Sequence, residues 1–437
     1  MVESVVAPRS VTDATRPVNR AGYVLAVLTA TYAVNFLDRQ VVNILAESIK
    51  RDLQISDTQL GLLTGTAFGL FYSTLGLPIA RLADRHSRVR IITIALAVWS
   101  ALTAACGVAQ NYAQLFLMRL GVGVGEAGGT PPAHSLIADY FPQERRTFAM
   151  AVFALGVPLG SFCGFLLGGI LDAGWGWRTA FVVAGLPGVV LSILVAFTLR
   201  EPPRGMSDRR QGTLRDQSEP ADLGESLKEI FARRSFIRLV LGGTCGIFIV
   251  YVTSAWLPSF LIRLHALDSA RVGGWIAFFV GVGGLIGSLG GGWLATRLKR
   301  RFVRAEVWMI ATTTLLTAPA LLWTLFAGST RSALAGMFVL YTLSFVWIGP
   351  TSALIQRVTP IRSRTLAAAL QLSIANVIAM LFGPPSIGYL SDRLQPVFAV
   401  ESLRYALAAT VIISLLGAAV YLSAGRHLLR DFETTGH

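Results

Sequence analysis

Long apolar stretches dominate the pattern of hydrophobic and polar positions along the chain. Each stretch is about 20 residues long, which is the length that an α-helix needs to cross roughly 30 Å of hydrocarbon. Twelve can be counted, six in each half of the sequence, with short polar segments between them. They cover residues 22–46, 60–82, 91–110, 114–139, 148–171, 178–199, 237–262, 271–296, 306–327, 332–357, 365–390 and 403–424. The pattern therefore predicts an all-α membrane protein with twelve transmembrane helices.

The sequence repeats at half its own length. The string P-x-x-x-R-T-x-A at Pro142–Ala149 recurs at Pro360–Ala367, 218 positions later. Pro132, Leu136 and Ile137 recur at the same spacing as Pro350, Leu354 and Ile355. A weaker match pairs LGLPIARLADR, which contains Asp84, with GSLGGGWLATR, which contains Thr296. Several matches in the same order at nearly constant spacing indicate two homologous halves, so we expect two pseudo-symmetric six-helix bundles.

One long polar segment, at about residues 200–236, separates the halves. Leu223, Leu227, Ile230 and Phe231 recur in it at helical spacing, which predicts a short amphipathic helix on the cytoplasmic membrane surface. A flexible solvated linker is the alternative. The expected organisation is a cytoplasmic tail at 1–20, a bundle at 21–200, a linker at 201–236, a bundle at 237–425 and a cytoplasmic tail at 426–437.

The composition supports a membrane protein. Of the 437 residues, 53% are hydrophobic and 14% charged, and the mean hydropathy is +0.60. A soluble protein of this size is less apolar. The net charge of +14 does not indicate nucleic-acid binding, because the basic residues lie between the spans rather than on a soluble domain. Every even-numbered connection is basic, so the positive-inside rule predicts that both termini are cytoplasmic.

No motif indicates an enzyme, a metal site or a disulfide. Cys106, Cys163 and Cys245 lie inside predicted spans, where small buried residues are the simplest interpretation. The five histidines do not show the H-E-x-x-H pattern or another metal spacing, and no nucleophile motif stands out. Residues 1–20 contain no apolar region typical of a cleavable signal peptide. We therefore expect no cofactor apart from a proton as coupling ion.

Four charged residues lie inside predicted spans. Asp38 and Arg39 belong to the first span, and Arg119 and Glu126 to the fourth. An ionised side chain at a helix centre costs about 2.5–3.5 kcal/mol on insertion scales, so such residues should be paired and should face a cavity. Two structural alternatives exist. Asp38 and Arg39 could merely neutralise neighbouring charges, and Arg119 could extend to the outer interface.

The spacing of these charges favours a function. Arg119 and Glu126 are about two helical turns apart and so share one face, and Arg39 is expected to approach Glu126 across a central cavity. Burial favours the protonated form of a carboxyl group, whereas a nearby guanidinium favours the ionised form. A movement that changes the distance from Arg39 to Glu126 would therefore change proton affinity. The hypothesis is that Glu126 carries the proton with Asp38 as its helper, while Arg39 alternates between carboxylate and substrate anion.

The second half lacks these charges, because Ser344 and Met337 occupy the positions equivalent to Glu126 and Arg119. Candidate binding residues there are Thr253, Trp256, Tyr341, Trp347, Gln371 and Asn376, with ordinary helix packing as the alternative for each. Amide side chains such as Asn35 are scarce within the spans, which argues against a sugar site. A largely apolar cavity with a charged end fits an amphiphile whose phosphate or carboxylate binds Arg39.

The loop after the second span resembles a signature of the major facilitator superfamily. RLADRHSRVR is similar to G-x-x-x-D-R-x-G-R-[RK], matching at Asp84, Arg85 and Arg88, with Ala80 and Ser87 in place of the glycines. The resemblance implies twelve helices in two bundles that alternate access to a central site. It also implies a cytoplasmic gate made by Asp84, Arg85 and Arg88, to which we add Arg145. Arg119 matches a buried arginine often found in proton-linked members, and Thr296 replaces the acid of the signature in the second half.

Several strings resemble the spinster branch of this superfamily: NFLDRQVVNIL, QLGLL, LADRHSR, RLGVGVGEAGGTPPAHSLIADYFPQERR and LREPPRG. The resemblance implies proton-linked movement of lysophospholipids or sphingoid phosphates, with Asp38, Arg39 and Glu126 in the site. The chain looks bacterial, so we expect it in the inner membrane. We also expect a monomer, with membrane lipids and an amphiphilic substrate as its partners. The alternatives are a proton-driven exporter of drugs or organic anions, a membrane enzyme acting on lipids, and a channel.

Overall fold

The computed structural model describes residues 18–207, 223–299, 304–360, 363–428 and 431. These residues form helices joined by short connections, with no strand among them. Helices lie at the positions of all twelve predicted spans. The all-α fold predicted from the apolar pattern is thus confirmed.

Nine helical elements lie between residues 18 and 198 of the described chain. They are α1 Val18–Leu53, α2 Asp57–Gly61, the π-helical segment η1 Leu62–Thr66, α3 Ala67–Arg85, α4 Arg88–Cys106, α5 Tyr112–Glu126, α6 Thr130–Tyr140, α7 Gln143–Ala154 and α8 Gly156–Thr198. Ser56 and Gln59 form a capping box at the start of α2, as their spacing predicts. Gly176, with φ 82°, divides α8 between the fifth and sixth spans.

The second half, with the helix that precedes it, follows the same order. Its elements are α10 Leu223–Phe231, α11 Arg234–His265, α12 Ser269–Phe278, the π-helical segment η2 Phe279–Gly283, α13 Gly284–Lys299, α14 Ala305–Phe326, α15 Thr330–Val346, α16 Ile348–Val358, α17 Arg364–Phe398, the 3-10 segment η4 Ala399–Glu401, α18 Ser402–Ala408 and α19 Val411–Gly425.

Length and composition alone recover most of the spans. Among the described residues, eight helical stretches could cross a membrane, or nine with the bent stretch that contains α2 and α3. Two of them, Gln143–Thr198 and Leu366–Gly425, each hold two predicted spans. The fourth span is not among them because it is interrupted, so that α5 has 15 residues and α6 has 11, each too short to cross a membrane alone.

The predicted amphipathic helix in the linker is present as α10. Its Ile230 is buried in an apolar cluster with Phe236 and Leu239 of α11, so this helix packs against the second bundle. The rest of the linker, at 208–222, and the tails at 1–17 and 432–437 lie outside the described residues.

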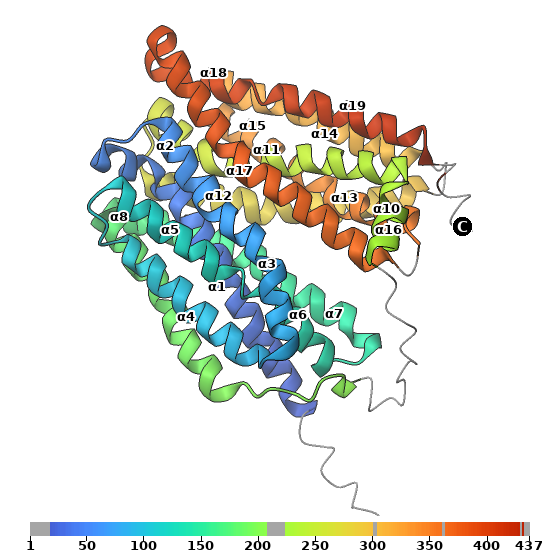
Figure 1. The fold of residues 1–437 in the computed structure, drawn as a ribbon. Coiled ribbons are helices and arrows are strands. Elements are labelled where there is room, and N and C mark those ends of the chain that lie inside the picture. Colours follow the sequence, from blue (N-terminus) through green and yellow to red (C-terminus); the bar gives the residue numbers. More distant parts are fainter. Residues whose placement is uncertain (1–17, 208–222, 300–303, 361–362, 429–430, 432–437) are drawn as a thin grey trace, which may run out of the picture.

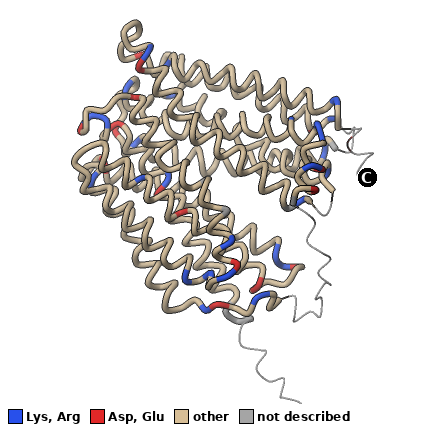
Figure 2. The backbone as a smooth tube through the Cα atoms, viewed as in Figure 1, with Lys and Arg blue, Asp and Glu red and all other residues tan. Residues whose placement is uncertain are grey.

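The two halves form separate bundles that meet at one end (Figure 1). We call the end where α1 begins and α19 ends the tail end, and the opposite one the far end. The hydrogen bonds between the halves join α1, α2, η1 and α8 to α11, α12 and α17, between the far end and the middle. Toward the tail end, α6 and α7 diverge from α10 and α16 (Figure 1). Charged residues gather at the two ends of the helices, and few lie between (Figure 2).

An ion pair occupies the same place in each half, with the charges exchanged. Arg88 at the start of α4 pairs with Asp139 at the end of α6. The positions 218 residues later are Glu306 at the start of α14 and Arg357 at the end of α16, which pair with each other. The repeat that is visible in the sequence is therefore also a structural equivalence.

Arg88 also binds the segment that leaves α8. Its Nε donates to Glu201 at 2.7 Å. Burial alone would raise the pKa of Glu201, but hydrogen bonds from the Val89 N–H, Arg88 and the Ser87 hydroxyl outweigh it and hold this pKa below its usual value. A carboxyl group with a lowered pKa stabilises the fold above its unfolded-state pKa, and this contribution is lost as the pH falls through the folded-state value.

We expect Arg88→Ala to destabilise the first bundle, because it leaves Asp139 buried without its cation. Removing one partner of a buried pair costs about 3–5 kcal/mol, which corresponds to a decrease of about 10 °C in the Tm of a bundle of this size. Thermal unfolding in detergent measures this. Arg90→Ala is the control, since Arg90 is exposed two residues further along the same helix. Equal Tm values for the two variants would contradict a stabilising role for the Arg88 pair.

Candidate functional site

Arg39 and Glu126 form a buried ion pair in the middle of the first bundle. Arg39 Nε on α1 lies 2.7 Å from Glu126 Oε2 at the end of α5. The Asn35 amide, one turn earlier on α1, donates to the same oxygen at 2.7 Å. Glu126 is fully buried and Arg39 is 9% exposed. The predicted approach of these two side chains is thus confirmed, and Asn35 joins them.

The position of Glu126 follows from a break in the fourth span. Glu126 is the last residue of α5, and tight turns through Gly128 and Gly129 lead to α6, which begins at Thr130 before two prolines. The carboxylate therefore sits at the negative end of one half-helix, which disfavours its ionised form. Broken helices of this kind are typical of ion and substrate sites in transporters.

Three aromatic rings surround the Arg39 guanidinium. Its Cζ lies 4.9, 4.6 and 4.3 Å from the ring centroids of Phe36, Phe68 and Tyr72. Cation–π attraction is stronger in desolvated sites like this one, so the rings hold the charge in place. Sequence reasoning missed them, because single aromatic residues within apolar spans look like ordinary packing.

Asp38 and Arg119 lie deeper in the same bundle. Both are buried, and Arg119 Nη1 donates to the Asp38 backbone carbonyl at 3.3 Å. Within the described residues, neither carboxylate oxygen of Asp38 has a hydrogen-bond partner, although Trp99 and Thr103 lie nearby. Arg119 is 1% exposed, so it does not extend to the membrane interface. All four charged residues singled out from the sequence therefore lie in one region.

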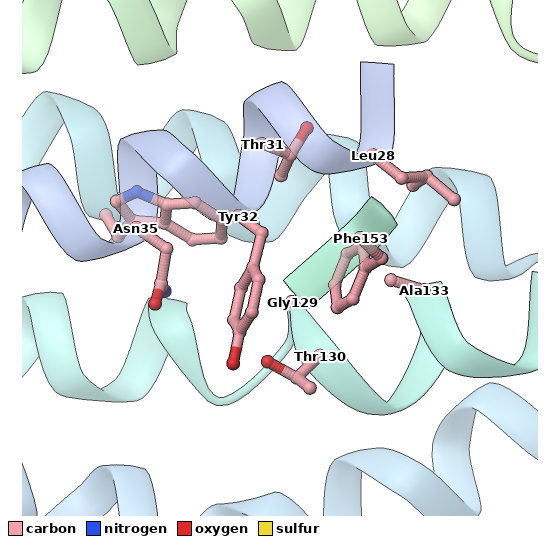
Figure 3. A pocket seen from close by; sticks show the side chains of 9 residues that line it. Leu28, Thr31, Tyr32, Asn35, Gly129, Thr130, Ala133 and Phe153 are labelled. Atoms are coloured by element: carbon pink, nitrogen blue, oxygen red, sulfur yellow. The ribbon is translucent and has the colours of Figure 1, made fainter. Parts of the chain in front are cut away.

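A small pocket adjoins the pair on the side of α6 and α7 (Figure 3). Asn35 and Tyr32 line it from α1, and Thr130 faces them from the start of α6 (Figure 3). The other lining residues are Leu28, Thr31, Trp99, Gly129, Ala133 and Phe153. The Oδ1 atom of Asn35 is buried and has no hydrogen-bond partner among the described residues, so the pocket contains an unused acceptor.

Asn376, one of the binding residues predicted in the second half, is connected to this site through Tyr251. Tyr251 of α11, which sequence reasoning did not single out, interacts electrostatically with Arg39 and Glu126. Its hydroxyl donates to Asn376 Oδ1 of α17 at 2.9 Å. Asn376 is thereby linked to the charged pair.

The other second-half candidates lie elsewhere. Trp256 Nε1 donates to the Pro384 carbonyl at 2.9 Å, which satisfies a backbone oxygen of α17. Tyr341 is buried beside Ser254. The remaining three, Gln371, Thr253 and Trp347, are buried within the second bundle.

The predicted gate residues lie at the tail end of the first bundle. Asp84, Arg85 and Arg145 are exposed, and no ion pair of theirs occurs in the described part of the chain. Arg88 instead pairs with Asp139 and Glu201 inside the first half. None of the four contacts the second bundle through a hydrogen bond shown in the structure.

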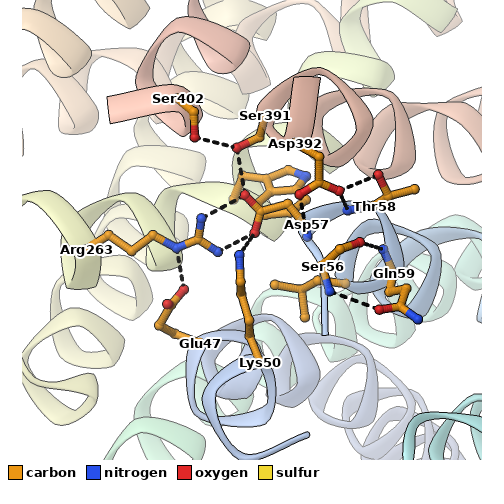
Figure 4. A network of polar contacts seen from close by, with 12 residues as sticks. Glu47, Lys50, Ser56, Asp57, Thr58, Gln59, Arg263, Ser391, Asp392 and Ser402 are labelled. Atoms are coloured by element: carbon orange, nitrogen blue, oxygen red, sulfur yellow. Dashed lines mark hydrogen bonds and ion pairs between the residues drawn. The ribbon is translucent and has the colours of Figure 1, made fainter. Parts of the chain in front are cut away.

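A charged network joins the halves near the far end (Figure 4). Arg263 of α11 donates from Nε to Glu47 at 2.7 Å, and from Nη1 and Nη2 to Asp57 at 2.9 and 2.7 Å. Lys50 and Ser391 also donate to Asp57. We call these five residues, Glu47, Lys50, Asp57, Arg263 and Ser391, the interbundle latch.

Asp392 extends this connection beyond the latch. Its carboxylate accepts hydrogen bonds from the backbone N–H groups of Asp57 and Thr58 at 2.9 and 2.7 Å, and so caps α2 from the opposite half (Figure 4). Sequence reasoning missed this network because each of its charges lies near a span end, where charged residues are common. Partners this far apart in sequence give no local signal.

The chain is similar to known transporters along nearly its whole length. The model of the Major Facilitator Superfamily matches residues 28–384. An MFS-type efflux pump of Mycolicibacterium smegmatis is 33% identical over 417 residues, covering 94% of each chain. The Sphingosine-1-phosphate transporter SPNS2 of Danio rerio is 27% identical, covering 93% of this chain and 84% of its own.

A solved structure is also similar. The crystal structure of a bacterial homologue of the human lysosomal transporter Spinster, in an inward-facing and unoccupied conformation, has a TM-score of 0.87 and 29% identity. The match covers 95% of this chain and 99% of that one.

Proposed function

Since this chain belongs to the Major Facilitator Superfamily and is spinster-like over nearly its whole length, we propose that it couples proton movement to the transport of an amphiphile by alternating access. It is a multi-pass integral membrane transporter and not an enzyme. The proposed substrate is a lysophospholipid or a sphingoid-type lipid, and the proposed coupling ion is the proton.

The observation that carries the proton proposal is the buried pair of Arg39 and Glu126. A carboxyl group without access to water binds a proton more readily, and a guanidinium 2.7 Å away opposes this. Protonation of Glu126 would release Arg39, and the approach of an anion to Arg39 would release Glu126 to be protonated. Asp38 and Arg119, buried behind the pair, are proposed to share this proton equilibrium.

The geometry of Arg39 supports an anionic headgroup. Its Nη2 is buried without a hydrogen-bond partner among the described residues, so a donor remains for a phosphate or carboxylate oxygen. Tyr251 and Asn376 of the second half face the same place, and amphiphile tails need only apolar walls. A relative named for sphingosine-1-phosphate transport is consistent with such a substrate.

We propose that the tail end faces the cytoplasm of a bacterial inner membrane. The connections after the second and fourth spans, which carry Arg85, Arg88, Arg145 and Arg146, lie at this end, in agreement with the positive-inside rule. The interbundle latch closes the far end, which makes the described state inward-facing, like the solved relative. Asp84, Arg85, Arg88 and Arg145 are then proposed to meet the second bundle when the molecule faces outward.

An exporter of drugs or organic anions is the second candidate, favoured by the similarity to an MFS-type efflux pump at 33% identity. The two candidates share the coupling site and differ in cargo. An anionic lysolipid should use Arg39, whereas a cationic dye should be repelled by it unless Glu126 neutralises the charge.

We expect Arg39→Ala to reduce the proton-driven flux of an anionic lysolipid by about 10- to 100-fold, because one charge-assisted hydrogen bond is worth about 1.5–3 kcal/mol. Arg39→Lys should recover little, since an ammonium ion cannot reproduce the Nε contact together with the stacking on three rings. The measurement is flux into proteoliposomes under an imposed proton gradient, with a small panel of lipids and one cationic dye.

Arg271→Ala is the matched control, because Arg271 is exposed and, among the described residues, forms its ion pair with its neighbour Asp268 on the surface. Its flux should equal that of the wild type. If the wild-type protein transports the dye but no lipid, the exporter replaces the lipid transporter as the proposed function. Undiminished lipid flux in Arg39→Ala would overturn the headgroup role.

A further inference from the structure

Two π-helical segments occur in the described part of the chain, one in the corresponding span of each half. They are η1 and η2, 217 residues apart in the second and eighth spans. In each, a backbone N–H bonds the carbonyl five residues earlier, from Ala67 to Leu62 and from Gly284 to Phe279. Single π-helical turns within α-helices are frequent at functional sites.

The helix on the far-end side of each π-segment is attached to the opposite half. Asp392 caps α2, and Gly61 of α2 lies so close to α17 that a Cβ atom there would be 2.6 Å from the Pro384 carbonyl oxygen. In the other half, the Ser269 hydroxyl of α12 donates to the Gly169 carbonyl of α8 at 3.3 Å. Both helices thus depend on contacts between the halves.

The helix on the tail-end side of each π-segment is attached to its own half. A Cβ atom at Gly123 of α5 would lie 2.4 Å from the Phe68 carbonyl oxygen of α3. Equally, a Cβ atom at Gly287 of α13 would lie 2.1 Å from the Thr342 carbonyl oxygen of α15. Each π-segment therefore lies near the point at which the main contacts of a span pass from the opposite half to its own half. Contact with the opposite half continues into the first turn of α3, where a Cβ atom at Gly69 would lie 2.8 Å from the Met380 side chain of α17.

Only η1 is connected to the charged site. Phe68 and Tyr72 lie in the first two turns after it, and their rings lie 4.6 and 4.3 Å from the Arg39 guanidinium carbon. The residues 217 positions later are Leu285 and Leu289, which are exposed. The two segments are equivalent in backbone and different in what they touch.

We propose that η1 and η2 are paired hinges, and that Phe68 and Tyr72 are positioning residues through which η1 couples separation of the halves at the far end to Arg39. When the far end opens, α2 and α12 lose their partners while α3 and α13 keep theirs, so each span bends at its π-segment. Bending at η1 shifts the two rings and loosens the pair of Arg39 and Glu126. The hinge role rests on the proposed alternating access, and the positioning role rests also on proton coupling.

Deletion of one residue tests the hinges, because a π-helical turn accommodates one extra residue and its loss leaves a continuous α-helix. Thr64 suits η1, since the hydrogen bonds of its hydroxyl to described residues go to the Leu60 and Gly61 carbonyls of the same span, and Val282 suits η2, since it is exposed. Thr64→Ala and Val282→Ala keep the extra residue and serve as matched controls.

Spin labels report the state of each end in a background without the three native cysteines. Suitable exposed positions are Val108 and Val400 at the far end, and Phe148 and Trp293 at the tail end. Pulsed electron-resonance distances should show two populations that exchange with pH in the wild type and in both alanine variants. Each deletion should leave mainly one population. Unchanged exchange in both deletion variants would overturn the hinge.

Tyr72→Leu tests the positioning role, with Leu289→Ala as the control at the equivalent place of the other half. Loss of the ring should shift the pH dependence of flux and weaken apparent substrate affinity by about tenfold, with little change in Tm. A change in Tm without a shifted pH profile would indicate that Tyr72 contributes only to packing, and it would overturn the positioning role. If the labels alternate but no proton-driven flux occurs in the wild type, the proton proposal fails while the hinges stand.

Discussion

Glu126→Gln is expected to abolish proton-driven accumulation of substrate while leaving substrate exchange at equal pH measurable. The amide has almost the shape of the carboxyl group but binds no proton in the physiological range, so the Arg39 pair can no longer alternate with protonation. Arg39 then loses its anionic partner in a buried site, where breaking such a pair costs about 3–5 kcal/mol. The loss of coupled flux should therefore be at least about 100-fold.

Proteoliposomes distinguish these two activities, with accumulation measured under a proton gradient and exchange measured with labelled substrate on both sides. Glu144→Gln is the matched control, since Glu144 is an exposed carboxyl group on α7. Flux in Glu126→Gln that still rises with the proton gradient would show that another group carries the proton. Asp38, buried in the same region, would then be the next residue to test.

Arg263→Ala is expected to shift the protein from the state that is closed at the far end to a state that is open there. Arg263 makes three charge-assisted hydrogen bonds across the halves, and its side chain is 11% exposed. Such bonds are worth about 1.5–3 kcal/mol each, so together they approach the roughly 5.5 kcal/mol that inverts a 99:1 equilibrium. The loss also leaves Asp57 and Glu47 of the first half buried without this cation, and opening of the far end would hydrate both carboxylates, which acts in the same direction.

The distances between the halves at the two ends measure this shift. Arg404→Ala is the control, because Arg404 pairs with Glu401 within the second half. The far-end distance should increase and the tail-end distance decrease only in Arg263→Ala. A distance distribution like that of the control would mean that apolar contacts, and not the latch, keep the far end closed.

The charged residues inside the predicted spans identified the core of the site from the sequence. Asp38, Arg39, Arg119 and Glu126 are costly in hydrocarbon, so each required a partner, and helix periodicity indicated which faces could meet. The break after Glu126 was not predicted, although Gly128, Gly129 and the prolines that follow were visible. Abundant glycine within the spans concealed that signal.

Aromatic and second-half partners could not be predicted in the same way. Phe68, Tyr72 and Tyr251 are compatible with any apolar helix, and only packing of the helices brings them to Arg39. Trp256 illustrates the converse, since a residue proposed for substrate binding is used to satisfy a backbone carbonyl of α17. Its substrate role stays a prediction.

By itself, the sequence determined the membrane class, the twelve spans, the twofold repeat and the four buried charges. These properties depend on the free energy of transferring each segment or side chain into hydrocarbon, which is local and can be read position by position. The tertiary structure alone decided that Arg263 meets Asp57 across 206 positions, that Tyr72 stacks on Arg39, and that π-helical segments interrupt the second and eighth spans. Such contacts depend on how the two bundles pack against each other, and this packing is determined by all twelve helices together.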